Sequence, residues 1–270
     1  MGNCLLASPA LSDSGSVAGG GTVAAAMGFG NLLTMQPSQR CRWTSLTGMF
    51  ATLDLGAAAE IDTLYFGSHN GSNAATVQVR AAASEANLTA APGFDTTYDL
   101  NVVDIVEDWP HLNSLRYLAT AESWRWWRFD FVDAANPAGH FDLGRLALAK
   151  AFRPSVNFDF GSTAGWVDNS TVAETLGANL IPTEGGRRRV WELLFNTLPE
   201  SEAWGDLFEF DRLRGLSRDL VFAMDPEETS RLHQRLFTCL VRSLSPISPN
   251  YPGADGQGNW VKRYRIEELV

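Results

Sequence analysis

The sequence predicts a mainly β protein made of antiparallel sheets, and three observations support that prediction. Short stretches of alternating apolar and polar residues recur along the chain, separated by turns rich in glycine, asparagine and proline. Nine tryptophans and fifteen phenylalanines fit large core residues between sheets better than they fit ligand stacking. Clear helix start and stop signals mark one segment, 201–213. The 270 residues suffice for one large domain or two ordinary ones.

The clearest β pattern lies in the stretch from Ala51 to Ala81, which reads ATLDLGAAAEIDTLYFGSHNGSNAATVQVRA. It predicts three short strands separated by glycine and asparagine turns. In the last strand, the apolar side chains share one face of the sheet: Val77, Val79 and Ala81. The polar side chains between them share the other face, so we expect a half-buried antiparallel sheet.

The segments on either side of this stretch carry weaker signals. Residues 1–25 are small and polar, and they predict either an arm on a neighbouring surface or short hairpin strands. Residues 82–91 predict a loop or a single helical turn. Residues 102–109 predict a strand, which Pro110 ends because proline cannot continue the ladder of hydrogen bonds.

A second strong alternation occupies residues 124–131. The side chains on its expected core face are Trp127, Phe129 and Phe131. A turn at 136–139 and a closing strand at 140–148 follow. Several short strands with turns between them predict a β-sandwich, so we assign residues 1–152 to a first, β-sandwich domain.

The remaining residues, 153–270, show a different pattern of predicted strands and helices. The segment 187–198 predicts a strand, and acidic residues after Pro199 begin a helix that Gly215 stops. Further strands are expected at 219–223 and 260–270. Residues 231–244 fit either a helix or a strand, and their local alternation favours a strand; a loop is expected between 244 and 260. We therefore predict a smaller α+β, split-barrel-like second domain.

The net charge, the length of the apolar runs and the cysteine count argue against several classes of function. A net charge of −10 argues against nucleic acid as a partner, because binding phosphates needs concentrated lysine and arginine. The one dense basic run, Arg187-Arg188-Arg189, is short, and we interpret it as a solvated strand edge or a subunit contact. No apolar run reaches the roughly 18 residues that span a bilayer, and no cleavable signal is recognised. Three scattered cysteines suggest reduced thiols.

The sequence shows no catalytic apparatus, so we predict no catalytic, cofactor-binding or metal-binding residue. None of the four histidines lies in a metal-binding pattern, and His69 is expected to hold a glycine-rich turn. The nucleophile elbow, the Walker loop and the dinucleotide-binding glycine pattern are missing. A glycosidase needs two convergent carboxylates, but Glu267 and Glu268 point to opposite faces of a strand, and no cleft marks Asp104 and Asp108.

One surface is predicted as a contact site. Trp124 and Trp126 lie opposite the expected core face of their strand and flank Arg125. Tryptophan and arginine together stack on sugars or form the centre of a protein interface. The alternative is that other elements cover both faces of the strand.

Several phrases stand in a characteristic order within residues 25–152. They are Leu53-Asp54-Leu55-Gly56, Ile61-Asp62-Thr63-Leu64, His69-Asn70, Ala75-Thr76-Val77-Gln78-Val79-Arg80, Trp127-Arg128, Asp133-Ala134-Ala135-Asn136-Pro137-Ala138-Gly139 and Leu143-Gly144-Arg145-Leu146. This order resembles the discoidin-like (galactose-binding-like) β-sandwich, in the version carried by tail proteins of bacteriophages and prophages. Residues 153–270 look like the small barrel domains of phage tail-tip and baseplate proteins.

The resemblance implies a non-enzymatic virion protein of the tail tip or baseplate. Such a protein is made in the bacterial host cytoplasm and assembles with copies of itself, as a ring, and with other tail proteins. Discoidin-like folds often bind sugars and some bind calcium, but fold alone transfers neither property, and no acidic loop here is dense enough to argue for calcium. The alternative function is a carbohydrate-binding module that attaches to host surface glycans.

Overall fold

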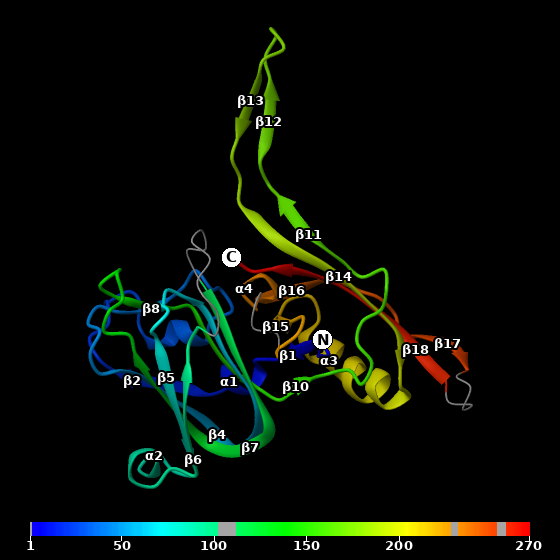
Figure 1. Ribbon diagram of the computed structural model, residues 1–270. Coiled ribbons are helices and arrows are strands. Elements are labelled where there is room, and N and C mark those ends of the chain that lie inside the picture. Colours follow the sequence, from blue (N-terminus) through cyan, green and yellow to red (C-terminus); the bar gives the residue numbers. More distant parts are fainter. Residues whose placement is uncertain (1, 102–111, 228–231, 253–257) are drawn as a thin grey trace. The chain divides into compact units, whose positions relative to one another are not determined.

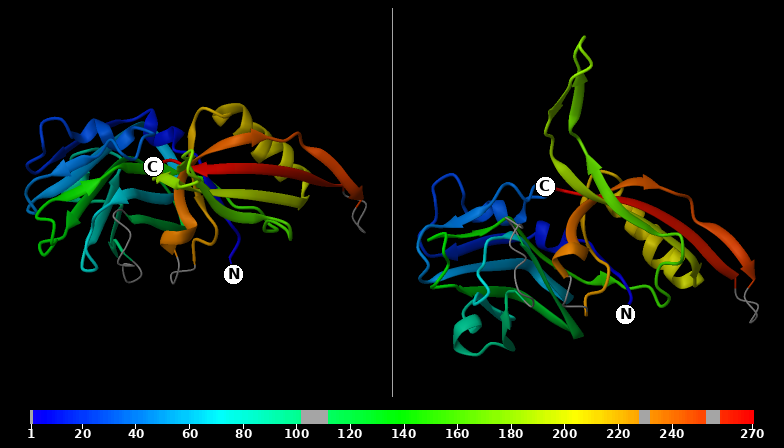
Figure 2. Two further views of the ribbon diagram at one scale, coloured as in Figure 1. Left: turned by 90° about the horizontal axis from the view of Figure 1, so that it is seen from above. Right: turned by 45° about the horizontal axis from the view of Figure 1, so that its top comes forward.

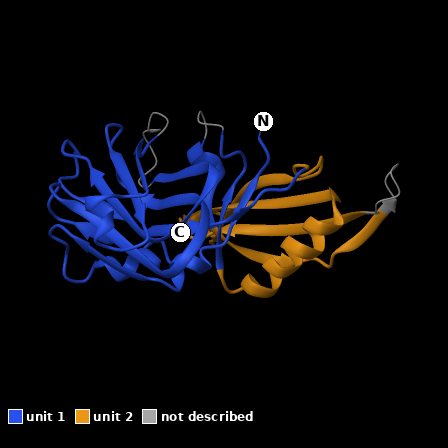
Figure 3. Cartoon of the chain, turned by 90° about the horizontal axis from the view of Figure 1, so that it is seen from below, with its two compact units in different colours: residues 1–155, 219–238 blue, residues 156–218, 239–270 orange. Residues whose placement is uncertain are grey.

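The computed structural model describes residues 2–101, 112–227, 232–252 and 258–270. Within these ranges the chain is mainly β, with antiparallel sheets and short helices, as the sequence predicts. It divides into two compact units (Figure 3), which are Met1–Ser155 with Asp219–Thr238, and Val156–Arg218 with Cys239–Val270. The sequence pattern predicts a single division of the chain, at 152/153. In the structure residues 219–238 return to the first unit, because β15 (Asp219–Ala223) pairs with β1 (Leu5–Ala7).

The first unit is built on a six-stranded sheet (Figure 1). Its strands follow the order β2-β4-β7-β5-β6, and β9 also pairs with β4. Their bounds are β2 Ser16–Gly20, β4 Met49–His69, β5 Thr76–Ala82, β6 Phe94–Asp99, β7 Leu112–Val132 and β9 Arg145–Ala149. Residues 1–25 thus contribute short strands, and α2 (Asn87–Ala90) is the single helical turn expected within 82–91. The strand expected at 102–109 lies outside the described residues.

β4 is one continuous strand where the sequence pattern predicts two. Its register with β7 shifts between Asp54 and Ala59, so the residues between them bulge out of the ladder. Gly56 lies in this bulge at a φ of +78°, in the left-handed region that favours glycine. The glycine bends the strand without ending it, and the three strands expected from Ala51 to Ala81 are therefore β4 and β5.

The strand face that the sequence pattern predicts for the core is buried. On β7 and β5 the expected core residues are at most 3% exposed: Trp127, Phe129, Phe131, Val77, Val79 and Ala81. The rings of Trp43, Phe131 and Phe141 pack with centroids 5.1 to 5.8 Å apart. Such tilted aromatic contacts add stability beyond the area that they bury.

A second layer closes over this core. β3 (Cys41–Trp43) and β8 (Phe141–Leu143) form a two-stranded sheet whose aromatic side chains belong to the same buried cluster, so the two sheets make a β-sandwich. The closing strand expected at 140–148 is split into β8 and β9 at Gly144. A Cβ atom at Gly144 would lie 2.3 Å from the carbonyl oxygen of Pro37, so only glycine fits there.

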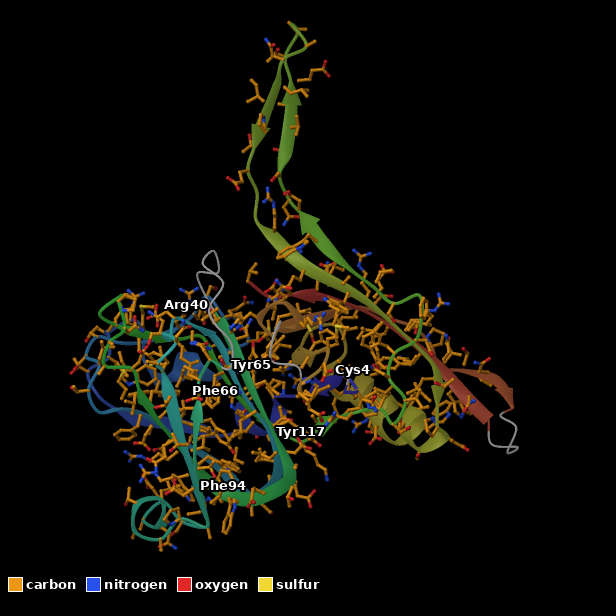
Figure 4. The ribbon with its side chains drawn as sticks, viewed as in Figure 1. Cys4, Arg40, Tyr65, Phe66, Phe94 and Tyr117 are labelled. Atoms are coloured by element: carbon orange, nitrogen blue, oxygen red, sulfur yellow. The ribbon has the colours of Figure 1, made fainter. Side chains whose placement is uncertain are left out.

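The opposite face of β4 is also covered. Phe66 packs in the sandwich core, whereas Tyr65 (both labelled in Figure 4) packs in a second cluster. This second cluster includes residues of β1, β15 and α4 (Leu232–Arg235). The Tyr65 hydroxyl donates to Asn113 Oδ1 and accepts from Thr238 Oγ1, each at 2.9 Å. The returning segment therefore belongs to the interior of the first unit.

The second unit contains a sheet in the order β16-β18-β14-β11, and β17 also pairs with β18. The bounds are β11 Thr163–Asp168, β14 Arg187–Leu198, β16 Leu236–Leu244, β17 Ser248–Pro252 and β18 Gly258–Glu268. The strands expected at 187–198, 219–223 and 260–270 are confirmed. Of the stretch 231–244, where a strand was favoured over a helix, residues 232–235 form the helix α4 and residues 236–244 form the strand β16. β17 lies where a loop was expected.

A helical segment packs on this sheet, at the position predicted for a helix. It consists of the π-helix η2 (Ser201–Leu207) and α3 (Phe208–Arg214), and Gly215 ends it at a φ of +55°. Tyr264 donates its hydroxyl to Asp211 Oδ1 at 2.7 Å, and Lys262 pairs with the same carboxylate. Both β18 side chains are 2% exposed, so this polar network is part of the interior between helix and sheet.

The backbone of the basic run 187–189 pairs with β11 on one side only, because the ladder between β14 and β18 begins at Val190. Arg189 is 3% exposed and pairs with Glu268. Arg187 is the solvated member of the run, and it pairs with Asp168 at 2.9 Å.

A two-stranded ribbon projects beyond β11 and β14 (Figures 1 and 2). It comprises β12 (Thr171–Glu174), β13 (Leu180–Thr183) and the turn between them. We call residues 169–186 the arm. With about eight residues on each side, an extended ribbon of this kind reaches about 25 Å.

Candidate assembly and binding surfaces

The predicted aromatic–arginine surface lies on β7 beside the bulge of β4. Trp124, Arg125 and Trp126 are each partly exposed. Arg125 donates Nε and Nη2 to the Asp54 carboxylate at 2.7 and 2.8 Å, and these hydrogen bonds lower the pKa of Asp54. The Arg125 guanidinium also lies 5.4 Å from the centroid of the Trp126 ring. Arg125 and Trp126 therefore form a surface patch held by an ion pair.

Trp124 differs from its prediction, because it packs against the sandwich core. A Cβ atom on Gly93 would lie 2.2 Å from the Trp124 ring, so the indole covers the backbone there. Its Nε1 donates to Glu122 Oε2 at 2.9 Å. The physical reason is the neighbouring bulge, since bulges increase local twist and redirect side chains near them.

His69 and the turn after it form a structural cluster at one end of the sandwich. The His69 ring is fully buried; its Nδ1 accepts from the backbone N–H of Gly71 at 3.2 Å. The proton therefore sits on Nε2, which donates to Ser114 Oγ at 2.8 Å. This geometry confirms the expected role of His69 in fixing the turn.

The Asp133 carboxylate organises the adjacent turn. It accepts from the backbone N–H of Ser72 at 3.0 Å and from Asn136 Nδ2 at 2.7 Å, and it also accepts from the Ser72 hydroxyl. Gly139 closes the turn with a φ of +69°. These three donors satisfy the carboxylate, and their hydrogen bonds hold the turn together.

A basic cluster lies beside this turn. Arg42 donates Nε and Nη2 to the Asp142 carboxylate, each at 2.7 Å, and His140 Nε2 lies 3.6 Å from the same group. Arg40 (labelled in Figure 4) interacts electrostatically with Asp142 and Arg42, and burial lowers the pKa of its guanidinium. Its buried Nε has no hydrogen-bond partner among the described residues. One carboxylate thus serves two guanidinium groups, which leaves a net positive charge.

The arm carries large apolar side chains that its own unit leaves uncovered. Val172 and Leu180 share one face and are 61% and 67% exposed, whereas Ile181 on the other face is 53% exposed. Leu176 at the tip is fully exposed, and Trp166 at the base of the arm is 58% exposed. Both faces of the ribbon therefore present apolar groups to solvent.

A second set of exposed apolar side chains lies along η2, α3 and the residues that follow. We call it the helix surface, and it consists of Trp204, Phe208, Leu213 and Leu216, which are 41%, 48%, 60% and 52% exposed. The Trp204 ring lies 5.1 Å from that of Phe208 and 5.3 Å from that of Trp260. Exposed clusters of this kind mark interaction sites on soluble proteins.

Sequence reasoning identified neither surface as functional. The signal for the arm was the hairpin phrase Leu176-Gly177-Ala178-Asn179 between two short apolar runs. The signal for the helix surface was the spacing of its aromatic residues. Trp204 and Phe208 each follow a buried residue, Ala203 and Leu207, by one position, so they lie off the buried face of the helix.

In the described ranges, few features suggest a site for a small ligand or a segment that spans a membrane. No group of three or more histidine, cysteine, aspartate or glutamate side chains in these ranges is placed to hold a metal ion. Of the helices in the described residues, none has the length and apolar character needed to cross a bilayer. An open depression on the sheet of the second unit is lined by Glu192, Leu194, Ser243, Arg263 and Arg265, and its Arg265 and Glu192 form an ion pair at 3.4 Å.

Neither a protein-family model nor a curated protein sequence matches this chain, whereas several solved structures resemble it. One is the module CBM32-1 from a family 31 glycoside hydrolase of Clostridium perfringens. It is 9% identical, with a TM-score of 0.37 over 52% of this chain and 96% of the module. A second is CBM32-6 of the Clostridium perfringens protein CpGH89, at 14% identity and a TM-score of 0.37, over 53% of this chain and 98% of that one.

A third is the family 32 module of Clostridium perfringens NanJ in complex with galactose. It is 10% identical, with a TM-score of 0.37 over 54% of this chain and 99% of that one. Each of these three matches covers about half of this chain. The likeness concerns the fold, and it assigns no binding property to this chain.

Proposed function

We propose that this chain is a non-enzymatic structural protein of a bacteriophage tail tip or baseplate. Copies assemble as a ring around the tail axis and dock neighbouring tail proteins, and the chain is made in the host cytoplasm before it joins the virion. The order of sequence phrases that resembles phage tail proteins supports this assignment. The second unit, as a small split-barrel-like domain, serves as the assembly module.

One structural observation carries the proposal, namely the arm. An isolated two-stranded ribbon is marginally stable in water, yet this one presents apolar side chains on both faces. In a free monomer these exposed side chains add no stability, and they favour aggregation. An assembly subunit covers them when it joins its neighbours.

Electron microscopy of intact particles tests the proposal. Reconstruction of a phage that encodes this chain should place density for both units in a ring around the tail axis. Particles from a phage whose copy lacks residues 169–186 should lose this ring or fail to form tails. Density for the chain away from the tail, or normal tails without any copy of the chain, would refute the proposal.

A second candidate function is attachment to host surface glycans by the first unit. The basic cluster of Arg40, Arg42 and His140 favours it, because guanidinium groups bind carboxylates such as those of acidic sugars. A glycan array should then give a reproducible signal that Arg40→Ala abolishes and Arg125→Ala leaves intact. The reverse pattern would assign binding to the aromatic–arginine patch, and no signal at all would remove this candidate.

A further inference from the structure

We propose that one face of the sheet in the second unit binds carboxylates, and that it docks an acidic peptide segment of a neighbouring protein. We call it the basic face and define it by four arginines: Arg188 on β14, Arg242 on β16, and Arg263 and Arg265 on β18. The proposal rests on the proposed function, because it names the chemistry of a partner that the assembly module docks.

The strand register brings these side chains to one side of the sheet. In the ladder between β14 and β18, Glu192 lies opposite Arg265 and Leu194 opposite Arg263, so their side chains share a face. The other face packs under η2 and α3, and Tyr264 on that side is 2% exposed. On the basic face both Arg263 and Arg265 are exposed.

The basic face holds more positive than negative charge. Besides four guanidinium groups, this side of β14, β16 and β18 carries two carboxylates, those of Glu192 and Glu267. The Glu267 carboxylate serves three of the arginines at once, at 3.3 to 3.4 Å: Arg188, Arg242 and Arg265. Two positive charges therefore remain in surplus, on a chain whose net charge is −10.

The ion pairs on this face are longer than strong pairs elsewhere in the chain. A charge-assisted hydrogen bond is about 2.7–2.9 Å long, and Arg42, Arg125 and Arg212 each reach a carboxylate at 2.7 Å. On the basic face, each ion pair between described residues measures 3.3 or 3.4 Å.

Two of the arginines keep hydrogen-bond donors for a ligand. The buried Nε of Arg188 has no hydrogen-bond partner within the described ranges. Arg263 forms no ion pair with any residue that the structure describes. Guanidinium groups bind carboxylates through paired N–H donors, so these two arginines suit a carboxylate from another molecule.

A depression in the basic face gives such a ligand room. It has a volume of about 380 Å³, and its lining includes Arg263, Arg265, the polar Ser243 and the apolar Leu194. This volume lies within the range of about 300–1,000 Å³ that is usual for ligand sites. A carboxylate in the depression would meet two guanidinium groups beside a hydroxyl group.

The spacing of the arginines fits an extended peptide. Arg263 and Arg265 are alternate residues of one strand, so their Cα atoms lie about 7 Å apart. Alternate side chains of an extended peptide have the same spacing, so two carboxylates of such a segment can each face one arginine. A nucleic acid would instead bring an unbroken row of phosphates past Glu192 and Glu267, towards a chain of net charge −10. Charge complementarity therefore favours an acidic peptide.

Binding of a synthetic hexaglutamate peptide to the full chain tests the site. Titration calorimetry at low salt should give a dissociation constant below about 1 mM. The affinity should fall as salt is added, because salt screens exposed charges. Hexaglutamine is the neutral control peptide and should not bind. Arg242→Gln with Arg263→Gln should weaken hexaglutamate binding about tenfold, because charge-assisted hydrogen bonds are lost.

Arg187→Gln with Arg212→Gln is the matched control. These arginines are 60% and 63% exposed and lie outside the basic face, so the variant loses the same charge elsewhere. It should leave the affinity nearly unchanged. Glu192→Gln should tighten binding, because it frees Arg265 and removes a repelling carboxylate. Circular dichroism checks the folding of each variant, and a damaged fold would not bind more tightly.

Several results would overturn the proposal. They are a wild type that does not bind hexaglutamate, and a matched control that weakens binding as much as the Arg242 and Arg263 variant does. Tighter binding of a single-stranded oligothymidylate would assign the face to nucleic acid. A wild-type oligomer that the Arg242 and Arg263 variant loses in light scattering would make a second copy the ligand.

The outcomes separate this site from the proposed function. A chain that binds hexaglutamate but is found away from tails would refute the proposed function and leave the carboxylate site standing. A chain found in the tail ring that does not bind hexaglutamate would refute the carboxylate site alone.

Discussion

The returning segment 219–238 is joined to the sandwich by a buried ion cluster, which gives a sharp test of the fold of the first unit. Arg145 on β9 is fully buried, and its Nη2 lies 2.7 Å from Asp13 Oδ1 and 2.9 Å from Asp219 Oδ2. Its Nε also donates to Asp219 Oδ2 at 3.1 Å. Asp219 itself is 1% exposed. We predict that Arg145→Met strongly destabilises the first unit.

The expected magnitude follows from burial. Removing one partner of a buried ion pair typically costs about 3–5 kcal/mol, because the other charge loses its partner away from water. With an m-value of about 2 kcal/mol per molar urea, the unfolding midpoint should fall by about 1.5–2.5 M. The double variant Arg145→Met with Asp219→Leu should recover a large part of this loss, because it removes both buried charges.

Urea unfolding followed by circular dichroism provides the measurement. Arg187→Met is the control, since its partner is Asp168 and both side chains are largely exposed, at 60% and 44%. This control should leave the urea midpoint nearly unchanged. If Arg145→Met shifts the midpoint no more than the control does, the argument that this cluster fastens the returning segment is wrong.

Three further outcomes are expected. Gly144→Ala should lower the melting temperature through a loss of about 1–3 kcal/mol, because its Cβ would lie 2.3 Å from the Pro37 carbonyl oxygen; an unchanged melting temperature would contradict that clash. Burial raises the pKa of the Cys41 thiol from 9.0 to about 12, so its contribution to stability is present below pH 9 and is lost between about pH 9 and 12. Unfolding measured across that range should show a steeper fall for the wild type than for Cys41→Ala. Arg125→Ala should raise the pKa of Asp54 toward its ordinary value in an NMR titration, because hydrogen bonds from Arg125 lower it.

Local patterns in the sequence predicted much of the first unit and the helix of the second. The alternation around Trp127, Phe129 and Phe131 identified a buried strand face, because successive side chains on a strand point to opposite sides. Gly215 marked the end of the helix, since a positive φ favours glycine. The structural role of His69 also followed from its place in a turn.

Other features depended on residues far apart in the chain. Trp124 packs inward because β4 bulges beside it, and the alternation within β7 does not reveal a bulge in its partner strand. Arg189 is buried because β18 pairs beside β14 and supplies Glu268. No local signal distinguishes this arginine from the exposed Arg187.

The sequence by itself determined the mainly β class, the buried faces of β5 and β7, and the site of the helix, because each depends on the period of nearby side chains. Only the tertiary structure decided that residues 219–238 belong to the first unit and that the arm and the helix surface are uncovered. Apolar residues in a sequence look alike whether they are buried or exposed. Their exposure is decided by which distant strands and helices pack over them, and in the arm none does.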